Sequence, residues 1–279
     1  MSRVDLHIHS TASDGNLNPG EIVARAFRRG LSVIALTDHD TVEGVAPAQE
    51  AASACPALRI IPGLELSSVS RGHEVHILGY LIDIRHEGLL LGLEKMRSFR
   101  NERAEAMIEK LAGLGVHINW STVKRIAAEG SVGRPHIARA MLERGYVTSF
   151  REAFTRYIGY EGPAYVQGPR ITSVEAIELI LRAGGVPVLA HPLSIDDWQA
   201  KIPELKDAGL SGIEIYYNGY TAMEMDGMSR FAGKYGLIAT GGSDFHGVNP
   251  GTETTLGGTE VPIEVVDSLF RLAMRGVIH

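Results

Sequence analysis

The chain has 279 residues, of which 44% are hydrophobic and 22% are charged, a composition typical of a soluble globular protein with one large or two ordinary domains. Its single cysteine, Cys55, excludes an intrachain disulfide and a thiolate-rich zinc site. No signal-peptide core precedes the first strand and no apolar run approaches a membrane span, so we expect a cytoplasmic protein that does not bind membranes.

The formal net charge of −6 is unevenly distributed along the chain. Residues 86–170 contain 13 Lys and Arg and 9 Glu, a net charge of +4, whereas the remainder contains 14 Lys and Arg and 24 Asp and Glu, a net charge of −10. An acidic frame suits bound cations, and a basic segment suits an anionic substrate. Functionless variation of surface charge is the alternative interpretation.

Strand-like runs alternate with helical runs, a pattern that predicts parallel strands joined by crossover helices. Nearly every motif with chemical groups stands at or just after a predicted strand end, the face of a (βα) barrel where active sites lie. We therefore predict an α/β fold with a seven-stranded (βα) barrel. The predicted strands are Val4–Ile8, Ser32–Leu36, Arg59–Leu66, Glu74–Leu81, Val186–Ala190, Gly212–Tyr216 and Leu237–Thr240.

The first predicted helix has clear start and stop signals. Asn18 is its N-cap, Pro19 takes the first helical position, Glu21 completes a capping-box spacing and Gly30 ends it. Further helices of the alternating pattern are predicted at Thr41–Ala54, Ser173–Ala183, Asp197–Ala208, Ala222–Tyr235 and Ile263–Ala273.

Residues 86–170 interrupt this alternation, because nothing strand-like lies among them. We interpret them as a helical insertion, a cap subdomain between the fourth and fifth strands that folds over the barrel mouth; packing beside the barrel for stability alone is the alternative. The predicted domains are thus 1–85 and 171–279 for the barrel and 86–170 for the insertion. Its predicted helices are Glu87–Leu114, Ser121–Ala128, His136–Arg144 and Ser149–Tyr157.

Imidazole and carboxylate groups are concentrated in a few short segments near the predicted strand ends. These are the side chains that bind Mn²⁺, Fe²⁺ and Zn²⁺ when four or more converge on one point. The pattern predicts a metal-dependent hydrolase. The segments are Asp5–His9, Thr37–Asp40, His191–Pro192 and Ser243–His246, with Asp14, Glu65 and His76 between them.

The His7-Ile8-His9 sequence is the most specific of these signals. Residues two apart on a strand share a face, so Val4, Leu6 and Ile8 take one face while His7 and His9 take the other. Two imidazoles directed together to an interior need hydrogen bonds or a metal. A lone histidine is more often a core or surface residue, so the pair carries the argument.

Taken together, these segments resemble the polymerase and histidinol phosphatase (PHP) superfamily over nearly the whole chain. The resemblance implies a distorted seven-stranded (βα) barrel with the helical insertion between strands 4 and 5. The stretches Ser10–Gly15 and Gly133–Ala138 look like the branch that hydrolyses small nucleotides and short RNA. The leading signatures are Asp5–Ser10, Leu36–Asp40, Gly63–Glu65, Val75–Tyr80, Leu189–Pro192 and Gly242–His246.

The resemblance implies a site for two to three divalent metal ions. Mn²⁺ is the expected metal, with Fe²⁺ and Zn²⁺ as alternatives, because an oxygen donor at Asp14 favours harder cations. The implied ligands are His7, His9, Glu65 and Asp244 for the first metal, Glu65 as a bridge with His76 and His191 for the second, and Asp14, His39 and His246 for the third.

Hydrolysis of a phosphate ester needs an activated water and neutralisation of phosphoryl oxygens, which paired metals supply. The predicted catalytic residues are Asp38, His39, Asp40 and His246. The two aspartates flank His39 and are predicted acceptors that orient imidazoles; capping of the following helix is the alternative for Asp40. A protonated histidine near the third metal would donate to the leaving group, and the sequence does not name it.

Arg134 is the leading substrate-binding residue, because it precedes Pro135 at a predicted helix start and offers a planar fork for phosphate. His136 and Arg100 are the other predicted substrate contacts. Arg97, Arg100 and Arg103 share nearly one face of the long helix, where a solvated salt-bridged face is the alternative.

We expect a phosphoesterase that acts on small nucleotides, removing the 3′-phosphate of 3′,5′-nucleoside bisphosphates, with short single-stranded RNA hydrolysed from the 5′ end as a companion activity. A phosphatase for histidinol phosphate or another small metabolite is the alternative enzyme. An inactive PHP-fold binding module is the alternative of another class, and the full donor set argues against it. No protein partner is inferred.

Overall fold

The computed structural model describes residues 3–128, 130–167, 171–247 and 254–276. The chain divides into two compact units, Met1–Gly92 with Ile171–His279, and Leu93–Arg170. We call the first the barrel unit and the second the helical unit. The division into functional domains at residues 85/86 and 170/171 stays a prediction.

The barrel unit is built on a sheet whose main path contains seven strands in the order β1-β2-β3-β4-β6-β7-β8. Backbone hydrogen bonds from Leu6 to Gly241 (3.3 Å) and from His9 to Phe245 (2.9 Å) connect the first strand with the last and nearly close the barrel. The predicted distorted seven-stranded barrel is confirmed. Its strands are β1 (Val4–Asp5), β2 (Val33–Leu36), β3 (Arg59–Ser70), β4 (His73–Tyr80), β6 (Val186–Leu189), β7 (Gly212–Tyr217) and β8 (Ile238–Gly242).

Strand β4 runs antiparallel to both of its neighbours, β3 and β6, while the other pairs on the path are parallel. The expectation of parallel strands throughout is wrong at this strand. Arg71 and Gly72 join β3 to β4 with positive φ angles of 50° and 83°. Two such residues form a tight hairpin turn, which returns the chain beside β3. The hairpin also sets His76 diagonally across from Glu65 on one face of the sheet.

The first strand is shorter than the predicted Val4–Ile8. After Asp5, the backbone of Ile8 and His9 bonds to the loops that follow β2 and β8 rather than continuing the ladder: Ile8 N–H donates to Thr37 Oγ1 at 3.0 Å, and His9 N–H donates to Phe245 O. A further strand, β5 (Ile171–Thr172), pairs with β3; its two residues are too few to show a periodicity.

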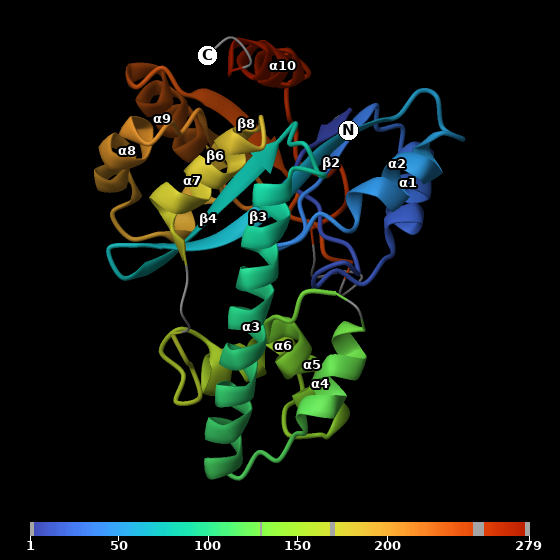
Figure 1. The fold of residues 1–279 in the computed structure, drawn as a ribbon, viewed down its shortest axis with the longest axis vertical. Helices are drawn as coiled ribbons and strands as arrows, with labels where there is room; N and C mark the ends of the chain where they lie inside the picture. Colours follow the sequence, from blue (N-terminus) through green and yellow to red (C-terminus); the bar gives the residue numbers. More distant parts are fainter. Residues whose placement is uncertain (1–2, 129, 168–170, 248–253, 277–279) are drawn as a thin grey trace. The chain divides into compact units, whose positions relative to one another are not determined.

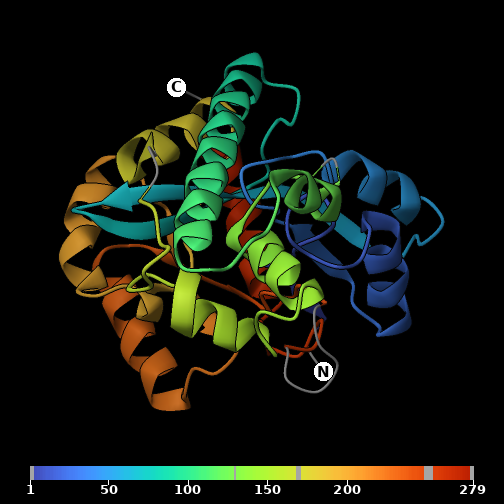
Figure 2. The same cartoon turned by 90° about the horizontal axis from the view of Figure 1, so that it is seen from below.

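Helices lie on both sides of these strands, with α1 and α2 on one side and α7, α8 and α9 on the other (Figures 1 and 2). The predicted capping box of α1 is present, since Asn18 Oδ1 accepts from Glu21 N–H at 2.9 Å and Glu21 Oε2 accepts from Asn18 N–H at 2.8 Å. The barrel-unit helices are α1 (Pro19–Arg28), α2 (Val45–Ala52), α7 (Ser173–Arg182), α8 (Trp198–Asp207), α9 (Ala222–Lys234) and α10 (Glu264–Gly276).

Helix α2 begins four residues after the predicted start at Thr41. Gly44 precedes it and packs closely against the loop after β2, where a Cβ would lie 2.5 Å from Asp38 Oδ2. Residues 41–44 therefore turn around that loop before the helix begins. In the core, Val265, Val266 and Leu269 of α10 pack with buried residues of β1, β2 and β6, which fills the barrel interior with apolar side chains.

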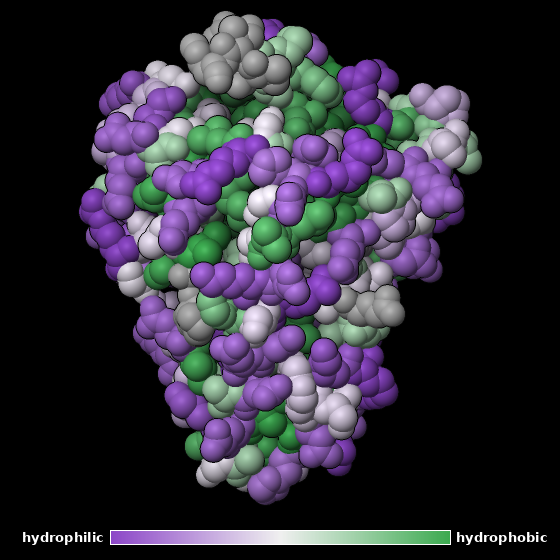
Figure 3. Space-filling model, in the orientation of Figure 1, coloured by the Kyte–Doolittle hydropathy of each residue, from purple (hydrophilic) through white to green (hydrophobic). Residues whose placement is uncertain are grey.

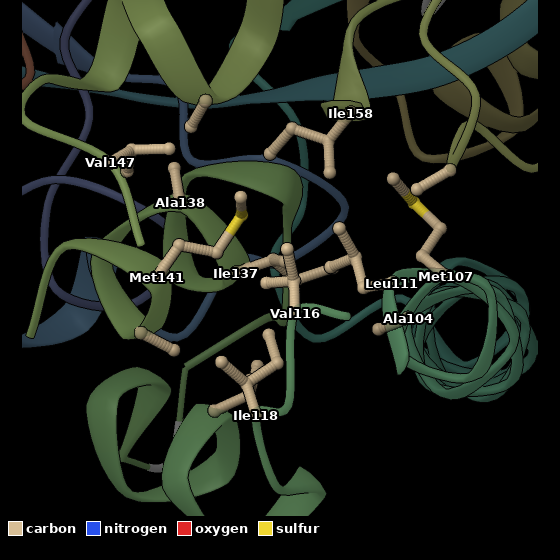
Figure 4. Packing of buried hydrophobic residues seen from close by; sticks show 14 of the residues in the cluster. Ala104, Met107, Leu111, Val116, Ile118, Ile137, Ala138, Met141, Val147 and Ile158 are labelled. Atoms are coloured by element: carbon tan, nitrogen blue, oxygen red, sulfur yellow. The ribbon is translucent and has the colours of Figure 1, made fainter. Parts of the chain in front are cut away.

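The helical unit has a core of its own, in which Met107, Leu111, Val116, Ile137 and Met141 are buried together (Figure 4). Its described residues contain no strand, as predicted. The elements are α3 (Glu87–Gly113), whose first turns belong to the barrel unit, α4 (Trp120–Ala127), α5 (Arg134–Glu143), α6 (Phe150–Ala153) and a π-helical turn (Phe154–Ile158).

Hydrophilic side chains cover most of the face drawn in Figure 3, with small apolar areas between them. Among the described residues, no helix combines the length and the apolar character needed to cross a bilayer.

Candidate metal centre

The carboxylate of Glu65, fully buried on β3, lies at the middle of the candidate centre. Its Oε2 is 3.3 Å from His7 Nε2, 3.3 Å from His9 Nε2 and 3.1 Å from His39 Nδ1. Its Oε1 is 2.8 Å from His76 Nδ1 and 3.0 Å from His191 Nε2. The structure thus brings five predicted ligands around one carboxylate. They come from the loops after β1, β2 and β6 and from β4.

Asp244, in the loop after β8, contacts the same two histidines as Glu65. Its Oδ1 lies 3.3 Å from His7 Nε2 and 3.1 Å from His9 Nε2. The two imidazole rings lie side by side with centroids 5.1 Å apart. His7, His9 and Glu65 form one group whose donor atoms converge closely enough for a metal ion.

A second convergent group contains His9, Asp14, His39 and His246. Asp14 Oδ1 is 3.4 Å from His246 Nε2 and 3.6 Å from His9 Nδ1, and its Oδ2 is 3.9 Å from His39 Nε2. The rings of His9 and His246 stack with centroids 4.1 Å apart. His39 also converges with Glu65 and His76 in a third group, so this imidazole stands between two groups of donors.

The tautomers of three imidazoles are set by hydrogen-bond acceptors at their Nδ1 atoms. His7 Nδ1 is 2.9 Å from the Glu214 carboxylate, and His246 Nδ1 is 3.0 Å from the Asp244 carbonyl. Ser194 Oγ donates to the His191 carbonyl, so it accepts from His191 Nδ1 at 2.9 Å. Each Nδ1–H is therefore satisfied by its acceptor, and each Nε2 faces the carboxylates, where it would hold a metal after losing any proton it carries.

His9 supplies a direct test of whether a metal fits. It is fully buried, and neither ring nitrogen makes a hydrogen bond of acceptable geometry, although Nε2 lies close to two carboxylates. Buried polar groups are normally satisfied. Nitrogen and oxygen atoms that lie this close together without hydrogen-bond alignment are suitable ligands for a divalent cation. The residues around His9 therefore fit a metal ion.

The sequence is similar to a known protein family and to characterised relatives. The model of the PHP domain matches residues 5–158. A 5′-3′ exoribonuclease of Haemophilus influenzae is 36% identical over 248 residues, which cover 88% of this chain and 90% of the relative. A 3′,5′-nucleoside bisphosphate phosphatase of Chromobacterium violaceum is 35% identical over 256 residues, 90% of each protein.

This chain belongs to the PHP family. Among solved structures, an amidohydrolase from Chromobacterium violaceum with bound sulfate superposes with a TM-score of 0.88 at 33% identity, covering 99% of this chain and 97% of that one. The predicted family and the predicted class of enzyme, a hydrolase of phosphate esters, are confirmed.

Three residues in the loops of the candidate metal centre have a strained backbone. Asp40, His191 and Asp244 have positive φ angles of 52°, 24° and 53°, which residues other than glycine rarely adopt. All three lie in the loops that follow β2, β6 and β8 and carry proposed ligands. Such strain costs about 1–3 kcal/mol per residue and persists where the surrounding structure enforces it, which is common at functional sites.

The charges of the centre perturb one another strongly. Burial alone would raise the pKa of the Glu65 carboxyl, but the neighbouring His39, His76 and His7 outweigh burial and hold its pKa well below its usual range. Burial would likewise lower the pKa of His246, but Asp14 raises that pKa to about 10, and Glu65 raises the pKa of His76 to about 9. Without a metal, these imidazoles therefore carry protons at neutral pH.

Asp38 and Asp40 hold the loops that carry the ligands. Asp38 accepts from Ser10 N–H, Ser10 Oγ and Ser13 Oγ, each at 2.7 Å, and so fixes the loop that leads to Asp14. Asp40 Oδ1 accepts from Ser67 N–H at 2.7 Å and ties its loop to β3. The cap of α2 is Gly44, so the alternative role of Asp40 as a helix cap is not observed. Direct catalytic roles for both stay predictions.

The predicted substrate residues all belong to the helical unit. Arg134 is the first residue of α5, and its guanidinium lies over the rings of Phe154 and Tyr165 at 5.7 and 5.8 Å. His136 Nδ1 accepts from Gly133 N–H at 2.9 Å, which caps α5, and Arg100 donates to the Val132 carbonyl at 3.2 Å. The last two side chains thus have structural contacts; their contact with substrate stays a prediction.

Two residues of the centre escaped sequence reasoning. Glu214 on β7 is fully buried; besides His7, it accepts from His191 N–H at 2.8 Å. Tyr217 donates to Asp244 Oδ2 at 2.7 Å. The signal for Glu214 was available, because a charged residue inside the apolar strand Gly212–Tyr217 needs a buried partner. Nothing in the sequence distinguishes Tyr217 from other tyrosines.

Proposed function

We propose that this PHP protein removes the 3′-phosphate from 3′,5′-nucleoside bisphosphates and shortens small RNAs from the 5′ end. The observation that carries the proposal is the convergence of five imidazoles on Glu65, because one buried carboxylate among several imidazole nitrogens suits a cluster of divalent cations that would displace any protons on those nitrogens. The names of the two relatives support the choice of substrate.

The ligands that we propose are His7, His9, Glu65 and Asp244 for one metal, Glu65, His76 and His191 for a second, and Asp14, His39 and His246 for a third. Bound metals would supply an activated water and neutralise the phosphoryl oxygens. Mn²⁺ is the metal that we propose, since carboxylates contribute to all three positions. Glu214, Ser194 and the Asp244 carbonyl keep His7, His191 and His246 in the ligating tautomer.

The third position is the one that we propose to serve the leaving group. Its ligand His246 is 23% exposed, so a substrate can reach this position, whereas His7 and His9 are fully buried. A metal held there by Asp14, His39 and His246 would stabilise the developing alkoxide. We further propose that Arg134 binds the phosphate that does not react, and that binding energy from this phosphate orients the reacting ester.

The test is a comparison of kcat/KM for adenosine 3′,5′-bisphosphate, AMP, histidinol phosphate and a short 5′-phosphorylated RNA, all with Mn²⁺. We expect the bisphosphate to be preferred over AMP and histidinol phosphate. The Asp244→Ala protein serves as the control, since it removes a proposed ligand and any turnover that remains belongs to a contaminant. A clear preference for histidinol phosphate would overturn the proposal and leave the metal chemistry in place.

A further inference from the structure

A cavity of about 430 Å³ in the barrel unit adjoins the metal centre and has no role in the chemistry described above. It is lined by His191, Leu193, Ser194, Tyr217, Tyr220 and Asp244. His191 and Asp244 are proposed ligands, so the cavity borders the proposed metal positions. Its volume is in the range of cavities that bind small molecules.

Two tyrosines dominate the part of this cavity away from the ligands. The rings of Tyr217 and Tyr220 lie with centroids 5.0 Å apart. Tyr217 donates its hydroxyl to Asp244 Oδ2, and the Tyr220 hydroxyl accepts from Leu193 N–H at 3.0 Å. Both rings are therefore fixed by contacts within the protein, and both remain partly exposed.

The charge of the lining decides what the cavity can bind. Among the described residues that line it, none is lysine or arginine, so these residues offer no cation to a second phosphate. A larger cavity of about 780 Å³ shares Tyr217 and Tyr220; the described part of its lining also lacks lysine and arginine and includes Asp226 and Glu260. Fixed aromatic rings beside Leu193 instead suit a flat, neutral and apolar group.

We infer that Tyr217 and Tyr220 form a subsite for the nucleobase of the substrate, an inference that rests on the proposed function. Contacts run outward from Asp244 to Tyr217 and on to Tyr220, so the two rings extend away from the proposed metal positions, as the base of a nucleotide extends away from its phosphate. Stacking on an aromatic ring is available to every base, so this subsite accepts purines and pyrimidines alike.

The test uses Tyr220, because Tyr217 also contacts a proposed ligand. Two substrates are compared: adenosine 3′,5′-bisphosphate and 1-O-methylribose 3,5-bisphosphate, which lacks the base. For the Tyr220→Leu protein we expect kcat/KM for the nucleotide to fall by roughly 5- to 150-fold, the range for loss of one stacking contact, with kcat/KM for the abasic compound within about twofold. Metal content should equal that of the unchanged protein.

The Tyr220→Phe protein keeps the ring and loses only the acceptor for Leu193 N–H, so its kcat/KM for the nucleotide should stay within about threefold. An equal loss in both variants, or an equal loss on both substrates, would overturn the subsite. If the unchanged protein hydrolyses the nucleotide and Tyr220→Leu has no effect, the subsite alone is wrong. If the unchanged protein hydrolyses neither compound, the proposed function fails, and the subsite fails with it.

Discussion

Glu214 shows how a residue that is not a proposed ligand can control the centre. Its two oxygens accept from different donors, His7 Nδ1–H and His191 N–H, and so it sets both the tautomer of one proposed ligand and the backbone position of another. A partner of this kind fixes the orientation of the imidazole that it contacts and makes that imidazole a stronger metal ligand.

Replacing Glu214 with Gln should therefore weaken metal binding by about 10- to 100-fold. Only the oxygen end of the amide can accept a hydrogen bond, because the other end is an NH₂ group that donates. Either His7 Nδ1–H or His191 N–H must therefore face the NH₂ group. Mn²⁺ titration followed by calorimetry measures the change. Glu204→Gln is the matched control, because that side chain is 48% exposed and pairs only loosely with Arg71 at 3.5 Å. Equal affinities in both variants would contradict the role of Glu214.

The raised pKa values of His76 and His246, about 9 and 10, predict that metals displace protons. Metal affinity should then increase as pH rises from 6 to 9, because fewer protons compete for the imidazole nitrogens. Calorimetry at one pH in buffers of different ionisation enthalpy counts the released protons, and we expect at least about one per chain at pH 7. Release of no protons at pH 7 would show that the imidazoles are already neutral.

At the scale of elements, closure of the barrel brings the two ends of the sheet together at the centre. Gly242 on β8 packs directly on the segment that follows β1, where a Cβ would lie 2.3 Å from His7 N and 2.5 Å from His7 Cβ. Asp5 reinforces the same junction by accepting from Ser243 N–H at 2.8 Å and Gly257 N–H at 2.7 Å. The position of His7 thus depends on how closely β8 approaches.

Gly242→Ala should lower the free energy of unfolding by about 1–3 kcal/mol, since backbone atoms must shift to admit the methyl group, and it should also reduce metal content. Gly227→Ala is the control: Gly227 lies inside α9 with nothing within 4 Å of the added Cβ, so we expect a gain of about 0.5–1 kcal/mol. Urea unfolding of both variants measures the difference. A Gly242→Ala protein as stable as the unchanged one would argue against close packing of β8 on His7.

At the scale of the whole molecule, the two units differ in net charge and in the functional roles that we propose for their residues. The proposed ligands all belong to the barrel unit, whereas the proposed phosphate contact Arg134 belongs to the basic helical unit. Aromatic rings on Phe154 and Tyr165 hold the Arg134 guanidinium, which reduces the conformational entropy that binding would cost.

Arg134→Ala should raise KM for adenosine 3′,5′-bisphosphate by the equivalent of about 2–3 kcal/mol and leave metal content unchanged. Adenosine 3′-monophosphate lacks the second phosphate, so its KM should change little. Arg144→Ala, at the exposed far end of the same helix, is the control and should match the unchanged protein. Equal effects on both nucleotides would exclude a specific contact with the second phosphate, and loss of metal would assign Arg134 a structural role.

The sequence by itself determined most of the elements and the kind of chemistry, although it gave β1 and α2 other bounds and missed β5. Helix α1 followed from Asn18, Pro19 and Glu21 because caps and periodicity are local properties. The donors around Glu65 could be named because imidazoles and carboxylates placed at successive strand ends have few structural uses besides a metal. The resemblance to the PHP superfamily added the grouping of ligands.

Only the tertiary structure decided the direction of β4, the partners of the aspartates and the roles of Glu214, Tyr217 and Tyr220. Glu214 and His7 are 207 residues apart, and no local pattern encodes a hydrogen bond across that separation. The hairpin at Arg71 and Gly72 depends on two backbone angles that a sequence period does not report. Contacts of this kind exist only once the barrel has closed, because closure is what places the ends of distant strands within hydrogen-bond distance.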